Sequence, residues 1–176
     1  MGFHHIAVAA RDLQETDEFY AGTLEFELVK AVVAPTPAGG WAKHVFYDTG
    51  SDGMIAFWEL HDEKMAGADT AISTGLGLEA WVNHIAFAAA DLDDIERRKK
   101  QWLTAGHDVM EIDHGFCVSI YTMDPNGILV EFCTDTRPYT ADDRARAREL
   151  LADPAPTLES PPSPTFHEAP KEGAPA

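Results

Sequence analysis

The chain has 176 residues, 45% of them apolar, a length and composition that suit one globular domain or two small ones. Its 13 basic and 30 acidic residues give a formal net charge of −17 with histidine neutral, which argues against nucleic acid and an anionic membrane surface as partners. No apolar run approaches the roughly 18 residues of a membrane-spanning helix, no secretory signal pattern is visible, and two cysteines cannot form a disulfide framework, so we expect a cytoplasmic protein.

An internal repeat is the strongest feature of the sequence. Residues 5–13 read HIAVAARDL and residues 84–92 read HIAFAAADL, with seven identities in nine positions at an offset of 79. Two copies are too few for a solenoid, which needs three or more. The repeat therefore predicts two similar modules that pack together.

Each copy of the repeat opens the same order of elements. An apolar strand is followed by a helix that an aspartate can cap, Asp12 in the first copy and Asp91 in the second. The helices are expected over residues 13–21 and 92–105, because each stretch stops at a glycine. Strand-like runs then occupy residues 26–34, 43–48 and 54–60 in the first module and residues 108–112, 117–123 and 128–133 in the second. Each module therefore reads βαβββ, and the predicted fold class is α+β.

The chain divides into segments at changes in composition. The turn sequence DPNG at residues 124–127 predicts a hairpin between the last two strands. We expect a first module over 1–61, a linker over 62–80, a second module over 81–135, a C-terminal helix within 136–152 and a proline-rich tail over 153–176. Thr140 is a candidate cap for that helix. The tail is too rich in proline for a helix or a sheet core, so it is either mobile or an arm on a partner subunit.

Strand alternation sets two histidines apart from the core. Side chains alternate between the faces of a strand, so His5 and His84 share their faces with alanines, while the branched and aromatic residues lie opposite. Small side chains beside a histidine leave room for a ligand, whereas a packed core leaves none. A hydrogen-bonded structural histidine is the plain alternative at each position, but the same pattern in both repeats favours a ligand.

Two carboxylates lie inside apolar strands, Glu59 in IAFWEL and Glu131 in ILVEF. Burying a carboxylate is costly unless it is paired or binds a metal. His5, His84 and Glu131 form a two-histidine, one-carboxylate set, which suits Fe(II) with coordination positions left open. Adding Glu59 gives four ligands, which suit Ni, Mn, Co or Zn as well. Alternatively, Glu59 lies beside the metal without binding it.

Three stretches carry a resemblance to a known family. They are HIAV with the following DL and FY in residues 5–20, NHIAF in residues 83–87 and DPNGILVEF in residues 124–132. These motifs resemble the vicinal oxygen chelate superfamily, which includes glyoxalase I, fosfomycin- and bleomycin-resistance proteins and extradiol dioxygenases. The resemblance implies paired βαβββ modules that form a curved mixed sheet around a divalent metal. It also implies a small-molecule substrate held through two neighbouring oxygens, and a homodimer.

The extradiol dioxygenases offer one further match. They carry a tyrosine ten residues before the glutamate ligand, and Tyr121 lies ten residues before Glu131. Their acid–base histidine before the last strand of the first module is missing from residues 52–57, so His61 or His114 would replace it. His114 is better placed, because it precedes the strand of Tyr121. The resemblance therefore favours an Fe(II)-dependent, ring-cleaving dioxygenase of the extradiol type, with Tyr121 and His114 as catalytic residues.

Two other functions stay open. Glyoxalase I uses four ligands, which the four-residue set would match, but Ala9 and Glu63 stand where that enzyme has groups that bind glutathione. A lyase or isomerase of this kind would therefore act on another substrate. The second alternative is a resistance protein that only sequesters a drug, which would not need two histidines and two glutamates at one cavity.

Overall fold

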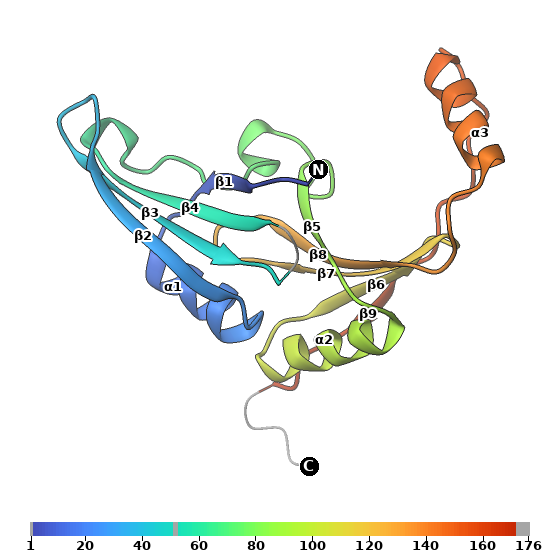
Figure 1. Ribbon diagram of the computed structural model, residues 1–176, viewed down its shortest axis with the longest axis horizontal. Helices are drawn as coiled ribbons and strands as arrows, with labels where there is room; N and C mark the ends of the chain where they lie inside the picture. Colours follow the sequence, from blue (N-terminus) through green and yellow to red (C-terminus); the bar gives the residue numbers. More distant parts are fainter. Residues whose placement is uncertain (1, 51–52, 172–176) are drawn as a thin grey trace.

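The computed structural model describes residues 2–50 and 53–171 of the chain. Residues 51–52 of the first module and residues 172–176 of the tail lie outside the described residues. Two mixed sheets form the molecule, one of four strands in the order β1-β4-β3-β2 and one of five strands in the order β5-β8-β7-β6-β9 (Figure 1). This arrangement confirms the α+β class and the paired βαβββ modules.

The elements of both modules follow the predicted order. The first module comprises β1 (His5–Ala9), α1 (Leu13–Asp17), the π-helical turn η1 (Glu18–Thr23), β2 (Glu27–Pro35), β3 (Trp41–Asp48) and β4 (Met54–His61). Two short 3-10 helices, η2 (Glu63–Met65) and η3 (Thr74–Leu76), lie in the linker. The second module comprises β5 (His84–Ala88), α2 (Leu92–Thr104), β6 (Val109–Asp113), β7 (Cys117–Met123) and β8 (Leu129–Asp135), after which come α3 (Ala141–Ala152) and β9 (Thr165–His167).

The predicted helix caps are confirmed. The Asp12 carboxylate accepts hydrogen bonds from the first backbone N–H groups of α1, and Asp91 accepts one from the backbone of α2. Thr140 caps α3 in a reciprocal arrangement with the side chain of Asp143. No residue of α3 is buried, and Figure 1 shows this helix projecting away from both sheets. Among residues 2–50 and 53–171, no helix is long and apolar enough to cross a membrane.

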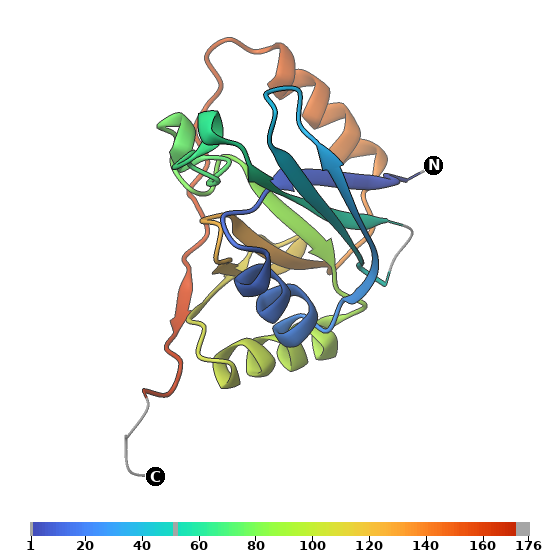
Figure 2. The ribbon, with the colours of Figure 1, turned by 90° about the vertical axis from the view of Figure 1, so that its left-hand side faces the viewer.

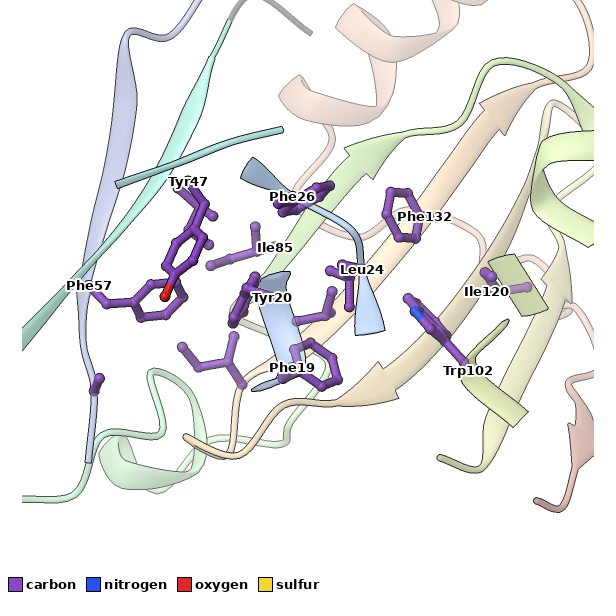
Figure 3. Close-up of a cluster of buried hydrophobic side chains, with 14 of the residues drawn as sticks. Phe19, Tyr20, Leu24, Phe26, Tyr47, Phe57, Ile85, Trp102, Ile120 and Phe132 are labelled. Atoms are coloured by element: carbon purple, nitrogen blue, oxygen red, sulfur yellow. The ribbon is translucent and has the colours of Figure 1, made fainter. Parts of the chain in front are cut away.

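One hydrophobic core joins the two modules. Both views place α1 and α2 on the same side of the sheets (Figure 1 and Figure 2). In the close-up, Phe19, Tyr20 and Leu24 lie between Phe57 of the first sheet and Phe132 of the second (Figure 3). Because strand side chains alternate, each sheet turns its apolar face to the helices and its other face away from this core. The faces that turn away carry the two repeat histidines.

The DPNG turn fastens the second module to the first helix. The Asp124 side chain is 5% exposed, and its Oδ1 accepts hydrogen bonds from the backbone of Asn126 at 2.9 Å and Ile128 at 2.7 Å. Its Oδ2 accepts a hydrogen bond from the buried Tyr20 hydroxyl at 3.1 Å. The Asn126 side chain in turn accepts from the Arg11 backbone N–H at 2.9 Å. One turn therefore satisfies polar groups from both modules.

Asp124→Ala should lower the free energy of unfolding by about 3 kcal/mol, because it leaves a buried hydroxyl and turn amides without their acceptor. Urea unfolding followed by tryptophan fluorescence measures the change. Asp113→Ala is the matched control, since Asp113 accepts from the Gly115 backbone in an exposed turn. Equal midpoints for the two variants would show that the Asp124 turn does not hold the modules together.

Three residues of the tail take a place that its composition does not predict. Thr165–His167 pairs antiparallel with β6 of the same chain and becomes the fifth strand of the second sheet. The high proline content describes the tail as a whole. Residues 165–167 lie between Pro164 and Pro170 and contain no proline themselves. They can therefore supply an exposed edge strand, which requires no place in the core.

Candidate functional site

Four of the predicted site residues gather at the second sheet, on the face turned away from the core, namely His84, His114, Tyr121 and Glu131. Glu131 of β8 lies in register with Ala86 of β5 on one side and Tyr121 of β7 on the other, so these side chains share one face. His84 at the start of β5 lies on the same face, and its Nε2 is 3.0 Å from Oε2 of Glu131. The Glu131 carboxylate is almost fully buried.

The His84 ring is held in one orientation. Its Nδ1 lies 2.8 Å from the backbone carbonyl oxygen of Trp81, and a carbonyl oxygen only accepts, so Nδ1 carries a proton. In the neutral imidazole, Nε2 then presents a lone pair to the Glu131 carboxylate. Two electron-pair donors facing one another at hydrogen-bond distance need a proton or a metal cation between them. The pair therefore fits the requirements of a metal site.

The Tyr121 hydroxyl lies beside this pair. It is 3.2 Å from Nε2 of His114, and the rings of His84 and Tyr121 are 6.3 Å apart between centroids. Burial, and after it the charge of Glu131, raise the pKa of Tyr121 to about 12, although a hydrogen bond with Ser119 opposes the rise. The hydroxyl therefore keeps its proton and can donate it to an acceptor on this face.

His5 lies on the other sheet. It stands on the outer face of the first sheet, where its ring centroid is 5.4 Å from that of Phe46 and 6.3 Å from that of His44. Within residues 2–50 and 53–171, no group of three or more histidine, cysteine, aspartate or glutamate side chains is placed to hold a metal ion. One copy of the chain thus brings His84 and Glu131 together but does not add His5 to them.

Glu59 lies on the helix side of the first sheet. Its Oε1 accepts from the Leu13 backbone N–H at 3.0 Å, and its Oε2 is 2.7 Å from Nε2 of His61. Burial would raise the pKa of Glu59, but the hydrogen bonds from Leu13 and His61 outweigh burial and lower it. The structure therefore brings Glu59 to the start of α1 and to His61, and not to the other predicted ligands.

Strand register explains the position of Glu59. In the second sheet, Ala86 pairs with Glu131, and in the first sheet the corresponding Ala7 pairs with Ala56. Ala56 is thus the counterpart of Glu131. Glu59 comes three residues later, an odd number, which puts it on the opposite face. His61 shares that face and stacks on Trp41 with ring centroids 3.6 Å apart.

His44 is a residue of the His5 face that sequence reasoning missed. It pairs with Trp58 in the sheet and also stacks on it, with ring centroids 3.8 Å apart. Its side chain is buried, and its Nε2 has no hydrogen-bond partner in the described part of the chain. Burial, and after it the charge of His5, lower the pKa of His44. Strand alternation could have predicted this position, because Ala42, His44 and Phe46 alternate with core residues along β3.

Known structures share this fold at low identity. A glyoxylase/bleomycin resistance protein/dioxygenase domain from Frankia is 17% identical, with 77% of this chain and 98% of that chain covered and a TM-score of 0.59. The fosfomycin resistance protein FosX from Listeria monocytogenes is 19% identical over 82% of this chain and 98% of that chain, with a TM-score of 0.55. FosX from Mesorhizobium loti is 22% identical over 82% of this chain and 97% of that chain, with a TM-score of 0.54.

Comparison of the sequence with known proteins and family models identifies the family of the chain. A search of curated proteins finds no match. The sequence model of the Glyoxalase/Bleomycin resistance protein/Dioxygenase superfamily matches residues 2–132, which span nearly all of both modules and include all the predicted site residues. This match confirms the resemblance carried by the repeat and the DPNG motif, and the chain belongs to the Glyoxalase/Bleomycin resistance protein/Dioxygenase superfamily.

Proposed function

We propose that the protein is a metal-dependent enzyme whose site is completed by two copies of the chain. His84 and Glu131 of one copy and His5 of the other would hold one divalent cation. The Nε2 lone pair of His84 faces the carboxylate of Glu131, and this arrangement is the observation in favour of a bound cation. The position of His5 on an outer sheet face supports the second copy, since a homodimer can bring two outer faces together.

The donor set fits Fe(II). Two imidazole nitrogens and one carboxylate are the ligands that non-haem Fe(II) sites use, and they leave coordination positions open. The alanines at positions 7, 9, 86 and 88 leave space beside both histidines. A bound Fe(II) supplies Lewis acidity and redox chemistry at these open positions. Ni, Mn, Co and Zn stay as alternatives, because imidazole and carboxylate ligands bind them too.

We infer that the reaction is ring cleavage of a catechol-type substrate with two neighbouring oxygens. Tyr121 would donate a hydrogen bond to the substrate oxygen on which negative charge develops. His114, whose Nε2 is 3.2 Å from the tyrosine hydroxyl, would orient that hydroxyl and serve as the acid–base histidine for the substrate. The walls of both sheets would fix the substrate between them, which contributes to rate through orientation.

A lyase or isomerase like glyoxalase I receives less support. Its four-ligand set needs Glu59, and Glu59 is occupied by the Leu13 backbone and His61 on the helix side. A protein that only binds a drug receives less support as well, because it gives no role to the buried Glu131 and its facing histidine.

Anaerobic reconstitution with Fe(II) tests the proposal. The reconstituted protein should bind about two equivalents of iron per symmetric dimer, one at each site. A screen of catechols should then yield the yellow colour of ring-cleavage products together with oxygen uptake. Protein that stays free of metal after reconstitution would favour the drug-binding alternative, and bound metal without oxygen uptake would favour the lyase.

A further inference from the structure

We propose that the C-terminal strand β9 builds an apolar subsite beside Tyr121, which takes an uncharged apolar substituent of the substrate. This inference rests on the proposed function and names the substrate class more closely, as catechols that carry an alkyl or aryl group. The strand lies beyond residue 132, where the family match ends, so the wall that β9 adds to the subsite lies outside the matched segment.

A continuous row of side chains leads from the candidate metal pair to the tail. Glu131 pairs with Tyr121, Tyr121 pairs with Met110, and Met110 pairs with Phe166 of β9. Paired residues of neighbouring strands share a face, so all four point away from the core. Three strand spacings separate Glu131 from Phe166, or about 14 Å, and the row changes from polar to apolar along that distance.

A cavity covers the apolar half of this row. Its volume is about 430 Å³, which lies in the range of sites for small molecules. Its apolar side chains come from four strands, namely Met110, Tyr121, Met123, Leu129 and Phe166. Phe166 is 71% exposed, so a large apolar surface stands open at the far end. A ligand that spans the cavity would cover both the methionines and this ring.

The tail strand is fixed in place as a wall of the cavity. On one side of Phe166, the Nε2 of His167 lies 2.8 Å from Oε2 of Glu111. Lys99 donates to the same carboxylate oxygen at 2.8 Å, which ties the strand to α2 as well. Beyond it, the Ala169 backbone N–H donates to Asp108 at 2.8 Å. Together these contacts hold Phe166 at a defined position next to Met110.

Charge restricts the substituent that this cavity accepts. Asp108 and Glu168 line it, and the whole chain has a formal net charge of −17. An anionic group would be repelled at this rim. Among the residues that the structure describes, no lysine or arginine lines the cavity. The substituent is therefore apolar and uncharged, of a length that reaches from the catechol ring to Phe166.

Binding of a series of 4-alkylcatechols tests the subsite without turnover. The full-length protein is loaded with Zn(II), which does not support oxygen chemistry, and binding of catechol, methyl-, propyl- and hexylcatechol is measured by calorimetry. Each added methylene should tighten binding about 4-fold until the cavity is filled. In Phe166→Ala the gain should fall below about 2-fold for each methylene, while catechol itself binds as to the unchanged protein.

Leu158→Ala is the matched control, because Leu158 is a tail residue that is 90% exposed and lies outside the cavity. It should give the same chain-length series as the unchanged protein. An equal gain for each methylene in Phe166→Ala and in the unchanged protein would overturn the subsite. So would a loss of the dimer in Phe166→Ala together with a loss of catechol binding itself, since Phe166 would then serve contact between copies.

A second measurement separates the subsite from the proposed function. The neutral fluorophore N-phenyl-1-naphthylamine needs no metal, and it should bind the metal-free protein and lose most of its affinity in Phe166→Ala. If no catechol binds but the fluorophore behaves in this way, the proposed function fails and the subsite stands. If the fluorophore binds both proteins equally, the subsite is wrong whatever the catechols do.

Discussion

His84→Ala should remove the bound metal and the activity while leaving the fold intact. The side chain stands at the start of β5 on the face away from the core, and the core face of that strand is made by residues such as Ile85. Losing a direct ligand should weaken metal binding by more than the 10- to 100-fold that loss of an outer partner typically costs. Elemental analysis after Fe(II) reconstitution measures the metal, and circular dichroism checks the fold.

Glu59→Gln serves as the control for this loss. Because Glu59 contacts Leu13 and His61, its replacement should leave the metal content unchanged. Full metal content in His84→Ala would show that the ligand assignment is wrong. Metal loss in Glu59→Gln comparable to that in His84→Ala would return the four-ligand site to consideration.

Mixing two inactive variants tests whether two copies share a site. His5→Ala and His84→Ala should each be inactive alone. In a dimer with shared sites, a mixed dimer has one site with both changes and one with neither, so random mixing should restore about a quarter of the sites. No recovery after the subunits have exchanged would mean that all ligands come from one copy.

Tyr121→Phe should lower turnover by about 10²- to 10³-fold, the typical effect of removing one hydrogen-bond donor from a developing negative charge. Metal content and substrate affinity should stay close to those of the unchanged protein, since the ring remains and only the hydroxyl is lost. Steady-state kinetics on any substrate found by the catechol screen would separate kcat from KM.

Tyr139→Phe is the matched control for the loss of a hydroxyl. The Tyr139 hydroxyl donates to Asp135 at 3.1 Å on an exposed part of the chain, and Tyr139 is not part of the paired row of Glu131 and Tyr121. Its removal should leave turnover unchanged. If Tyr121→Phe and Tyr139→Phe both retain full turnover, the ring-cleaving reaction lacks its distinguishing residue and the lyase becomes the better proposal.

Local patterns predicted most of the fold. The repeat, the helix-capping Asp12 and Asp91 and the DPNG turn each act through neighbours in sequence, so they could be interpreted without coordinates. Alternation along β7 and β8 allows Glu131 and Tyr121 to share a face, and the register across the turn, which the structure supplies, places them on it. The predicted features need only the period of a strand and the chemistry of a turn.

The parts that sequence could not predict depend on contacts between distant segments. Whether His5 meets His84 depends on how two sheets pack around shared helices, and no local pattern encodes that. Glu59 resembles Glu131 in its apolar surroundings, but the register of β1 with β4 decides which face it takes. The pairing of β9 with β6 likewise joins residues that are far apart in the sequence, such as Met110 and Phe166.

The hydrogen bond from the Tyr20 hydroxyl to Asp124 has a consequence for the synthesis of the chain. The two residues are separated by 104 positions, so the helix that carries Tyr20 leaves the ribosome long before the turn that accepts its hydroxyl. Until the second module is made, the Tyr20 hydroxyl lacks this acceptor and the shared core around Phe19 is incomplete. Nascent chains that stop before the DPNG turn should thus expose part of this core and depend on chaperones for solubility.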